Sequence, residues 1–153
     1  MHIESKIAAA AIAGMLCFAP MSAMASAKSE AENLRKLDIM LMVTSLRCRH
    51  GADDFQGDYQ RFSAKHLNTM KQAYTVLQTD LARQYGSNGA KRQLDRISVG
   101  MANQYGQGHP WLACDQLKEV TQQLTATTSR ATLLTAADEL LASRRPAQFA
   151  MLD

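Results

Sequence analysis

The chain has 153 residues, of which 17 are Lys or Arg and 14 are Asp or Glu, so its net charge is +3. The charges are scattered rather than clustered, which indicates an ordinary solvated surface and no nucleic-acid partner. The sequence contains no HExxH, GxSxG, CxxC or CxxCH motif and no phosphate-binding loop. The enzyme classes and the haem attachment that depend on those motifs are therefore excluded, and we expect no cofactor and no bound metal.

The first 27 residues have the three-part pattern of a secretory signal peptide. Lys6 precedes an apolar run over 7–19, Pro20 breaks that run, and the small residues 23–27 follow as Ala-x-Ala-x-Ala. We expect residues 1–27 to be removed by cleavage near Ala25 or Ala27. The alternative is an uncleaved anchor, but the apolar run is shorter than the roughly 20 residues of a spanning helix. The pattern predicts a periplasmic or secreted protein with no stable membrane span after cleavage.

Removal of this segment leaves two cysteines, Cys48 and Cys114. In the oxidising compartment that an exported chain meets, two thiols usually pair, so we expect one disulfide. The alternative is two separate buried thiols.

The periodicity of apolar residues predicts an all-α fold. No segment alternates between polar and apolar residues over a useful length, whereas apolar residues recur at intervals of three and four. The first helix is expected over 34–51, where Leu34, Leu37, Leu41 and Cys48 share one face. Further helices are expected over 55–85, over 90–105, from Pro110 as the opening residue, and after a cap at Ser129 or a neighbouring threonine.

These elements predict a four- to five-helix bundle linked by one disulfide. The bundle forms a single domain, 28–145, and a flexible C-terminal tail follows at 146–153. Gly86 and Gly106 are expected to end the second and third helices. His66 lies on the apolar face of the second helix, where we expect a half-buried histidine with one hydrogen-bonded nitrogen rather than a ligand.

A candidate binding site follows from the disulfide. Bonded cysteines have Cα atoms about 4.4–6.8 Å apart, so the pair would bring the segments after residue 46 and before residue 114 together at one end of the bundle. The candidate ligand-binding residues there are Arg47, Arg49, His50, Asp53, Asp54, His109 and Trp111, the only tryptophan. The alternative is two adjacent loops, in which the arginines suit the helix dipole and the aspartates cap a helix.

A resemblance to a known family is carried by two segments, MLMVTSLRCRHGADDFQGDYQRF and MANQYGQGHPWLACDQLK. With these segments the chain resembles a group of small exported proteins of alphaproteobacteria. That resemblance implies a helical, disulfide-bearing, exported protein and implies no activity and no catalytic residues. In general plan alone, the chain is also similar to the small acid-stress chaperones of the periplasm.

We interpret the sequence as an exported helical binding or interaction module whose partner is an unknown small molecule or an envelope protein. The alternative is a small periplasmic enzyme, a hydrolase, with its site near the disulfide end of the bundle. An enzyme requires a concave pocket that contains a titratable residue with a perturbed pKa. A binding module requires an exposed apolar patch or groove.

Overall fold

A computed structural model describes residues 21–143 of the chain. Within that range the protein contains five α-helices and no β-strand, which confirms the all-α expectation. The helices are α1 (Met21–Cys48), α2 (Gln56–Lys65), α3 (Leu67–Tyr105), α4 (Cys114–Ala126) and α5 (Arg130–Leu140). The expected tail at 146–153 and most of the expected signal peptide lie outside the described residues. In the described part, no helix is both long enough and apolar enough to cross a membrane.

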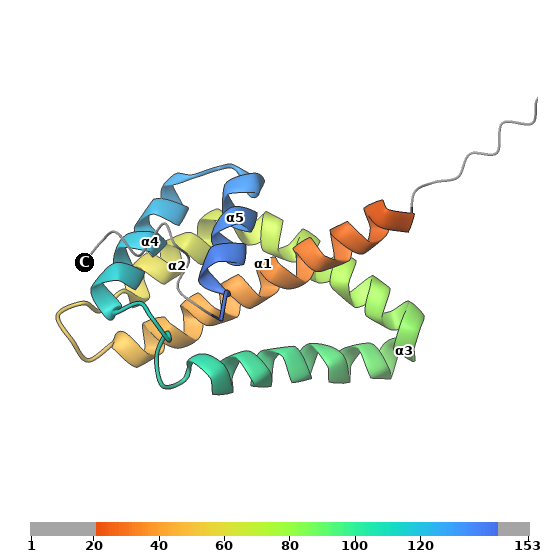
Figure 1. Ribbon diagram of the computed structural model, residues 1–153, viewed down its shortest axis with the longest axis horizontal. Helices are drawn as coiled ribbons and strands as arrows, with labels where there is room; N and C mark the ends of the chain where they lie inside the picture. The colour runs from red at the N-terminus through yellow and green to blue at the C-terminus, as the bar shows by residue number, and fades with distance from the viewer. Residues whose placement is uncertain (1–20, 144–153) are drawn as a thin grey trace, which may run out of the picture.

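Helix α1 is the central element of the fold. It contacts each of the other four helices. In Figure 1 the first part of α3 crosses α1, and the second part of α3 lies on the opposite side of α1 from α4 and α5. The expected buried face is confirmed, because Leu34, Leu37, Leu41 and Cys48 are all buried. Ile39 and Met40 are buried as well, so the buried face of α1 is wider than one stripe, while Met42 and Leu46 stay exposed.

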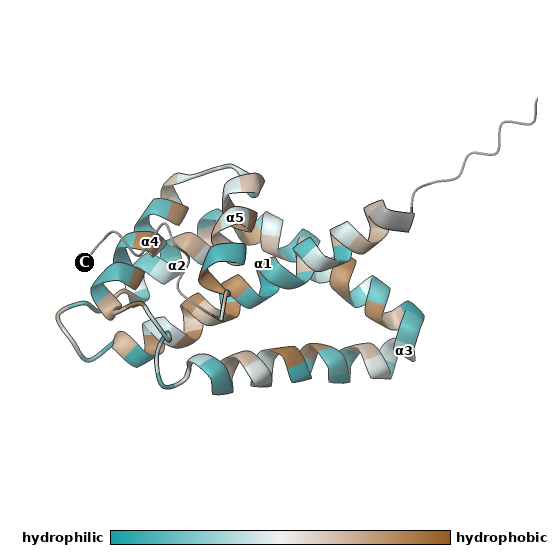
Figure 2. Ribbon diagram, in the orientation of Figure 1, coloured by the Kyte–Doolittle hydropathy of each residue, from teal (hydrophilic) through white to brown (hydrophobic). Residues whose placement is uncertain are grey.

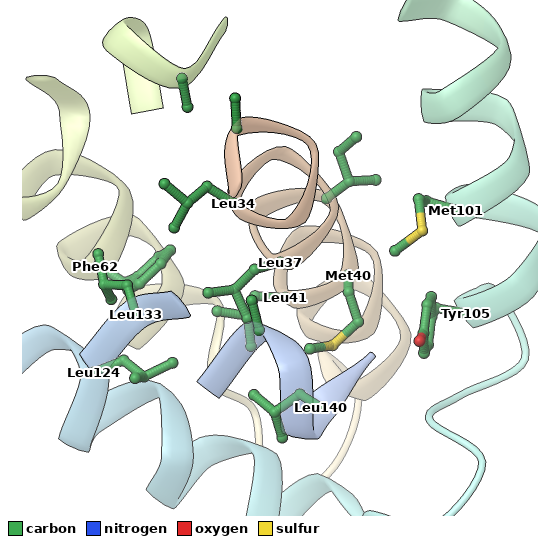
Figure 3. Close-up of a cluster of buried hydrophobic side chains, with 14 of the residues drawn as sticks. Leu34, Leu37, Met40, Leu41, Phe62, Met101, Tyr105, Leu124, Leu133 and Leu140 are labelled. Carbon is green, nitrogen blue, oxygen red and sulfur yellow. The ribbon is translucent and has the colours of Figure 1, made fainter. Parts of the chain in front are cut away.

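The side chains of α1 connect two halves of the core (Figure 3). Phe62, Leu124, Leu133 and Leu140 lie on one side of the helix, and Met101 and Tyr105 lie on the other. Hydrophobic residues follow the middle of α1, whereas the bend of α3 is hydrophilic (Figure 2). Burial of an apolar side chain contributes about 1.5–3 kcal/mol, and α1 supplies four fully buried ones to this core, Leu34, Leu37, Met40 and Leu41.

The expected single helix over 55–85 is wrong, because the chain breaks at His66 between α2 and α3. His66 has φ −100° and ψ 13°, and its side chain is only 4% exposed. Its Nε2–H donates to the carbonyl of Leu124, 2.8 Å away, in the last turn of α4. That turn leaves carbonyls without helical partners, and the imidazole satisfies one of them. The structural role expected for His66 is therefore confirmed, with deeper burial than expected.

Gly86 produces the sharp bend of α3. Its φ of 70° and ψ of 170° are not helical, and that region is open to glycine at little cost. The helix that was expected to end at Gly86 therefore does so, and a second arm continues to Tyr105. The two arms form a V, visible in green in Figure 1.

The expectation that Pro110 opens the fourth helix is wrong. Pro110 lies in the loop after Tyr105, and α4 begins at Cys114. There the Gln116 side chain accepts a hydrogen bond from the Ala113 N–H, 3.0 Å away, which satisfies one backbone donor at the helix start. The cap expected at Ser129 is confirmed, because its Oγ accepts a hydrogen bond from the Thr132 N–H.

Cys48 and Cys114 are paired, as expected, with Cα atoms 5.8 Å apart. The bond joins the last residue of α1 to the first residue of α4 across 66 residues of sequence. A loop of that length constrains the unfolded chain by about 4 kcal/mol in the entropy model. This is a large share of the roughly 5–15 kcal/mol that typically stabilises a domain.

Reduction of the disulfide should lower the melting temperature by on the order of 10 °C or more, because it releases this constraint. Thermal unfolding followed by circular dichroism, with and without dithiothreitol, measures the shift. The control is the double variant Cys48→Ser/Cys114→Ser, whose melting temperature should not respond to the reductant. Equal melting temperatures for the oxidised and reduced protein would contradict a stabilising bond.

Candidate functional site

The loop after α1 holds the first part of the expected site. Arg47, Arg49 and His50 are all exposed, and the Arg49 Nε donates to the His50 Nε2, 2.8 Å away. Arg47 lies in the last turn of α1, where a cation suits the helix dipole. These side chains are accessible to a ligand.

The two aspartates of that loop have different positions. Asp54 Oδ1 accepts a hydrogen bond from the Gln56 N–H, 2.9 Å away, and so satisfies a backbone donor at the start of α2. The N-cap of α2 is Phe55, which makes no side-chain cap hydrogen bond, so the expectation that an aspartate occupies the cap position is wrong by one residue. Asp53 is half-exposed and adjacent in sequence.

His109 organises the loop before α4. Its Nδ1 accepts hydrogen bonds from the backbone N–H groups of Trp111 (3.4 Å) and Leu112 (3.2 Å). Its Nε2 lies 2.9 Å from the Leu140 carbonyl, to which it donates. The imidazole is therefore neutral with its proton on Nε2, and both nitrogens have backbone partners. It also stacks on the Tyr105 ring, with centroids 5.5 Å apart.

Burial lowers the pKa of the His109 imidazole below its usual value, and the hydrogen bond to the Leu140 carbonyl partly offsets this effect. The geometry gives the same direction, because a proton on Nδ1 would face two N–H donors. Sequence reasoning missed this structural role of His109. Its hydrogen-bond partners are backbone groups of Leu112 and Leu140, which the loop conformation and the contact with α5 bring close to the imidazole.

Trp111 extends the same contact toward the end of α5. Its ring meets the His109 ring edge-on at a centroid separation of 4.6 Å, and its Nε1 lies 3.5 Å from the Ala142 carbonyl. His109 and Trp111 thus contact the end of α5 and the residues after it, whereas His50 and Asp54 form hydrogen bonds only with neighbouring residues in the sequence. Across the described residues, no group of three or more His, Cys, Asp or Glu side chains is placed to hold a metal ion.

A second cluster, centred on Asp38, was not expected from the sequence. The Tyr59 hydroxyl donates to Asp38 Oδ1 at 3.1 Å, and an Arg35 guanidinium nitrogen lies 3.5 Å from Asp38 Oδ2. Arg35 also donates to the Ser98 hydroxyl at 3.4 Å. The available signal was a carboxylate directly between Leu37 and Ile39, inside the most apolar segment of α1.

Burial raises the pKa of the Asp38 carboxyl above its usual value, while the Tyr59 hydrogen bond and the Arg35 charge act in the opposite direction. Burial also raises the pKa of Tyr59, as does the neighbouring Asp38 charge. Arg35 and Asp38 line two surface hollows of about 390 and 330 Å³. The other residues that line these hollows are Ile39, Met42, Ser63, Leu67, Met70, Lys71, Tyr74, Thr75, Ser98, Val99 and Ala102.

A groove between α4 and α5 is the third feature. Its volume is about 410 Å³, and it is lined by Val120, Gln123, Leu124, Ala131, Thr132, Thr135, Ala136, Glu139 and Leu140. Leu124 and Leu140 are buried, whereas Gln123, Thr132 and Thr135 are exposed. The groove therefore has an apolar floor and a polar rim, in which Glu139 is the one charged residue. At one end of the groove, the Leu140 carbonyl accepts a hydrogen bond from His109.

Together these features define a disulfide-linked all-α domain with an apolar groove in one helix pair and a polar cluster on its central helix. Comparisons with protein-family models, with curated proteins and with solved structures found no match. Function is therefore inferred from the geometry of the chain itself.

The two histidines of the expected site should behave differently when replaced. His109→Ala leaves two backbone N–H groups and the Leu140 carbonyl without partners, and each unsatisfied buried group costs about 1–3 kcal/mol. His50→Ala removes an exposed side chain and should change stability by less than about 0.5 kcal/mol. Urea unfolding at pH 7.5 measures both variants, and equal losses would contradict the structural role of His109.

Stability should also depend on pH through His109. The pKa of His109 is lower in the folded state than its usual value of 6.5. At a pH between the folded and unfolded pKa values, the unfolded chain therefore binds more protons than the folded chain. The contribution of neutral His109 to the free energy of unfolding is complete above about pH 6.5 and is lost as the pH falls through the folded pKa. In His109→Gln this step should disappear, and parallel stability curves for the variant and the original chain would contradict it.

Proposed function

We propose that the protein is an exported helical binding module whose α4–α5 groove takes an apolar segment of an envelope protein or an apolar small molecule. The groove carries this proposal. Its volume of about 410 Å³ lies in the range of about 300–1,000 Å³ that is common for ligand sites. An apolar floor with hydroxyl and amide groups on the rim suits a ligand that is mostly apolar, such as one face of a helix.

The attachment of both helices supports this role. The disulfide ties the first residue of α4 to α1, and His109 ties the end of α5 to the preceding loop. These two anchors lie at the same end of the α4–α5 hairpin, and the connection at 127–129 closes the other end (Figure 1). A groove held at both ends loses little conformational entropy on binding, which favours affinity.

The packing at the start of α1 supports export with removal of residues 1–27. The side chains at 23–27 are exposed, and the buried core of α1 begins at Ala31. Lys28 pairs with Asp80 at 2.9 Å. Ser29 and Glu32 have the spacing of a capping box, so a chain shortened to this point retains residues that can begin α1. Cleavage would therefore leave the packed domain intact in a compartment where the disulfide is stable.

Protein recovered from the envelope of the producing cell should begin near Ser26 or Lys28, because cleavage is expected after Ala25 or Ala27. Intact-mass spectrometry of the purified protein gives the start directly. Variants with Ala25→Leu and Ala27→Leu should accumulate at a higher mass, since bulky residues block recognition of the small-x-small pattern. A stable cytoplasmic form that starts at Met1 would contradict export.

The Asp38 cluster favours a second candidate, a small periplasmic hydrolase. A carboxyl with a raised pKa beside a surface hollow is the kind of group that serves as a general acid. The sequence placed this alternative near the disulfide, whereas the raised carboxyl pKa is found on the middle of α1. In the structure the Asp38 carboxylate pairs with Arg35 and accepts a hydrogen bond from Tyr59, and these contacts also suit a purely structural role.

Binding of 1-anilinonaphthalene-8-sulfonate, an anionic fluorophore whose aromatic rings bind to apolar surface, separates the two candidates. Val120→Asp introduces a charge in the groove and should weaken probe binding by at least about tenfold, or about 1.4 kcal/mol. Val99→Asp is the matched control, because Val99 is 58% exposed and lines the hollow beside Asp38. Fluorescence titration of both variants provides the measurement.

The binding proposal fails if Val120→Asp binds the probe as tightly as the original chain. A hydrolase centred on Asp38 predicts a different result. Turnover of a chromogenic ester or amide would then be lost in Asp38→Asn and retained in Val120→Asp.

A further inference from the structure

The α4–α5 groove lies next to the point where the described chain ends. Leu140 is the last residue of α5 and lines the groove, and the described residues continue only to Ser143. We infer that the groove binds the chain's own segment 144–153, which competes there with the external partner. This inference rests on the proposed binding role of the groove and identifies its resident occupant.

The composition of the segment matches the chemistry of the groove. Its sequence is RRPAQFAMLD, in which the large apolar side chains are Phe149, Met151 and Leu152. The groove offers a floor of Leu124 and Leu140 to such side chains. Burying a Phe or Leu side chain contributes about 1.5–3 kcal/mol each, which is sufficient for a reversible contact.

Charge complementarity sets the direction in which the segment enters. Glu139 is the one charged residue among those that line the groove, and it lies at the α5 end next to Leu140. Arg144 and Arg145 follow five and six residues later in the chain. An arginine beside Glu139 therefore begins the segment at the same end of the groove, and the apolar residues extend toward the connection at 127–129.

The reach of the segment agrees with this path. Phe149 is six residues beyond Ser143, so an extended chain spans up to about 20 Å between them. Helix α5 has 11 residues and a length of about 16 Å. The apolar residues can therefore reach any part of the groove. A tethered segment acts at an effective concentration of about millimolar, which an external partner must overcome.

A photo-cross-link in the full chain tests the contact. With p-benzoylphenylalanine in place of Phe149, illumination should give a product of monomer mass, in which residue 149 is joined to peptides that contain 120–124 or 131–140. Val120→Asp should reduce that product several-fold, and Val99→Asp should leave it unchanged. Cross-links to other parts of the same chain, or a product of dimer mass that shows a second copy as the occupant, would overturn the inference.

Probe binding separates this inference from the proposed function. In the full chain, Phe149→Ser/Leu152→Ser removes the apolar anchors and should tighten binding of 1-anilinonaphthalene-8-sulfonate several-fold, because the groove is then free. Unchanged probe affinity in that variant, together with weaker binding in Val120→Asp, refutes the resident segment and leaves the binding role standing. If Val120→Asp has no effect in either background, the binding role itself fails.

Discussion

The central position of α1 is the constraint on which the rest of the structure depends. Every other helix contacts α1, and its residues Leu34, Leu37, Met40 and Leu41 are fully enclosed. The first arm of α3 crosses α1 and its second arm runs along one side of it, while α4 and α5 lie on the other side (Figure 1). Because α3 does not share an extensive interface with α4 or α5, each half is positioned by α1 rather than by the other half. A change in the core of α1 therefore affects both halves.

Most of the fold could be predicted from the sequence because helix periodicity and capping act locally. The face of Leu34, Leu37 and Leu41, the bend at Gly86 and the cap at Ser129 all follow from neighbouring residues. The break at His66 could not be predicted, because its cause is a carbonyl in α4, 58 residues away. The late start of α4 has a similar origin, since His109 directs the loop by contacts with α5.

The candidate site could be predicted only in part, and the reason is physical. The disulfide correctly placed two loops at one end of the bundle, but residue type does not specify whether a histidine faces solvent or backbone. His50 is exposed, while His109 has both nitrogens bonded to backbone groups. The groove and the Asp38 cluster arise from the packing angle of helices, which periodicity does not encode. Asp38 was visible only as a carboxylate within an apolar run.

The two anchors of the groove differ in chemistry. Helix α4 is fixed to α1 by a covalent bond that does not respond to protons. Helix α5 is fixed at the same end by the neutral imidazole of His109, whose protonation would place a donor against two backbone N–H groups. Leu140 lines the groove, so the wall that α5 forms depends in part on a contact that is sensitive to protons, whereas the wall that α4 forms is attached by a covalent bond.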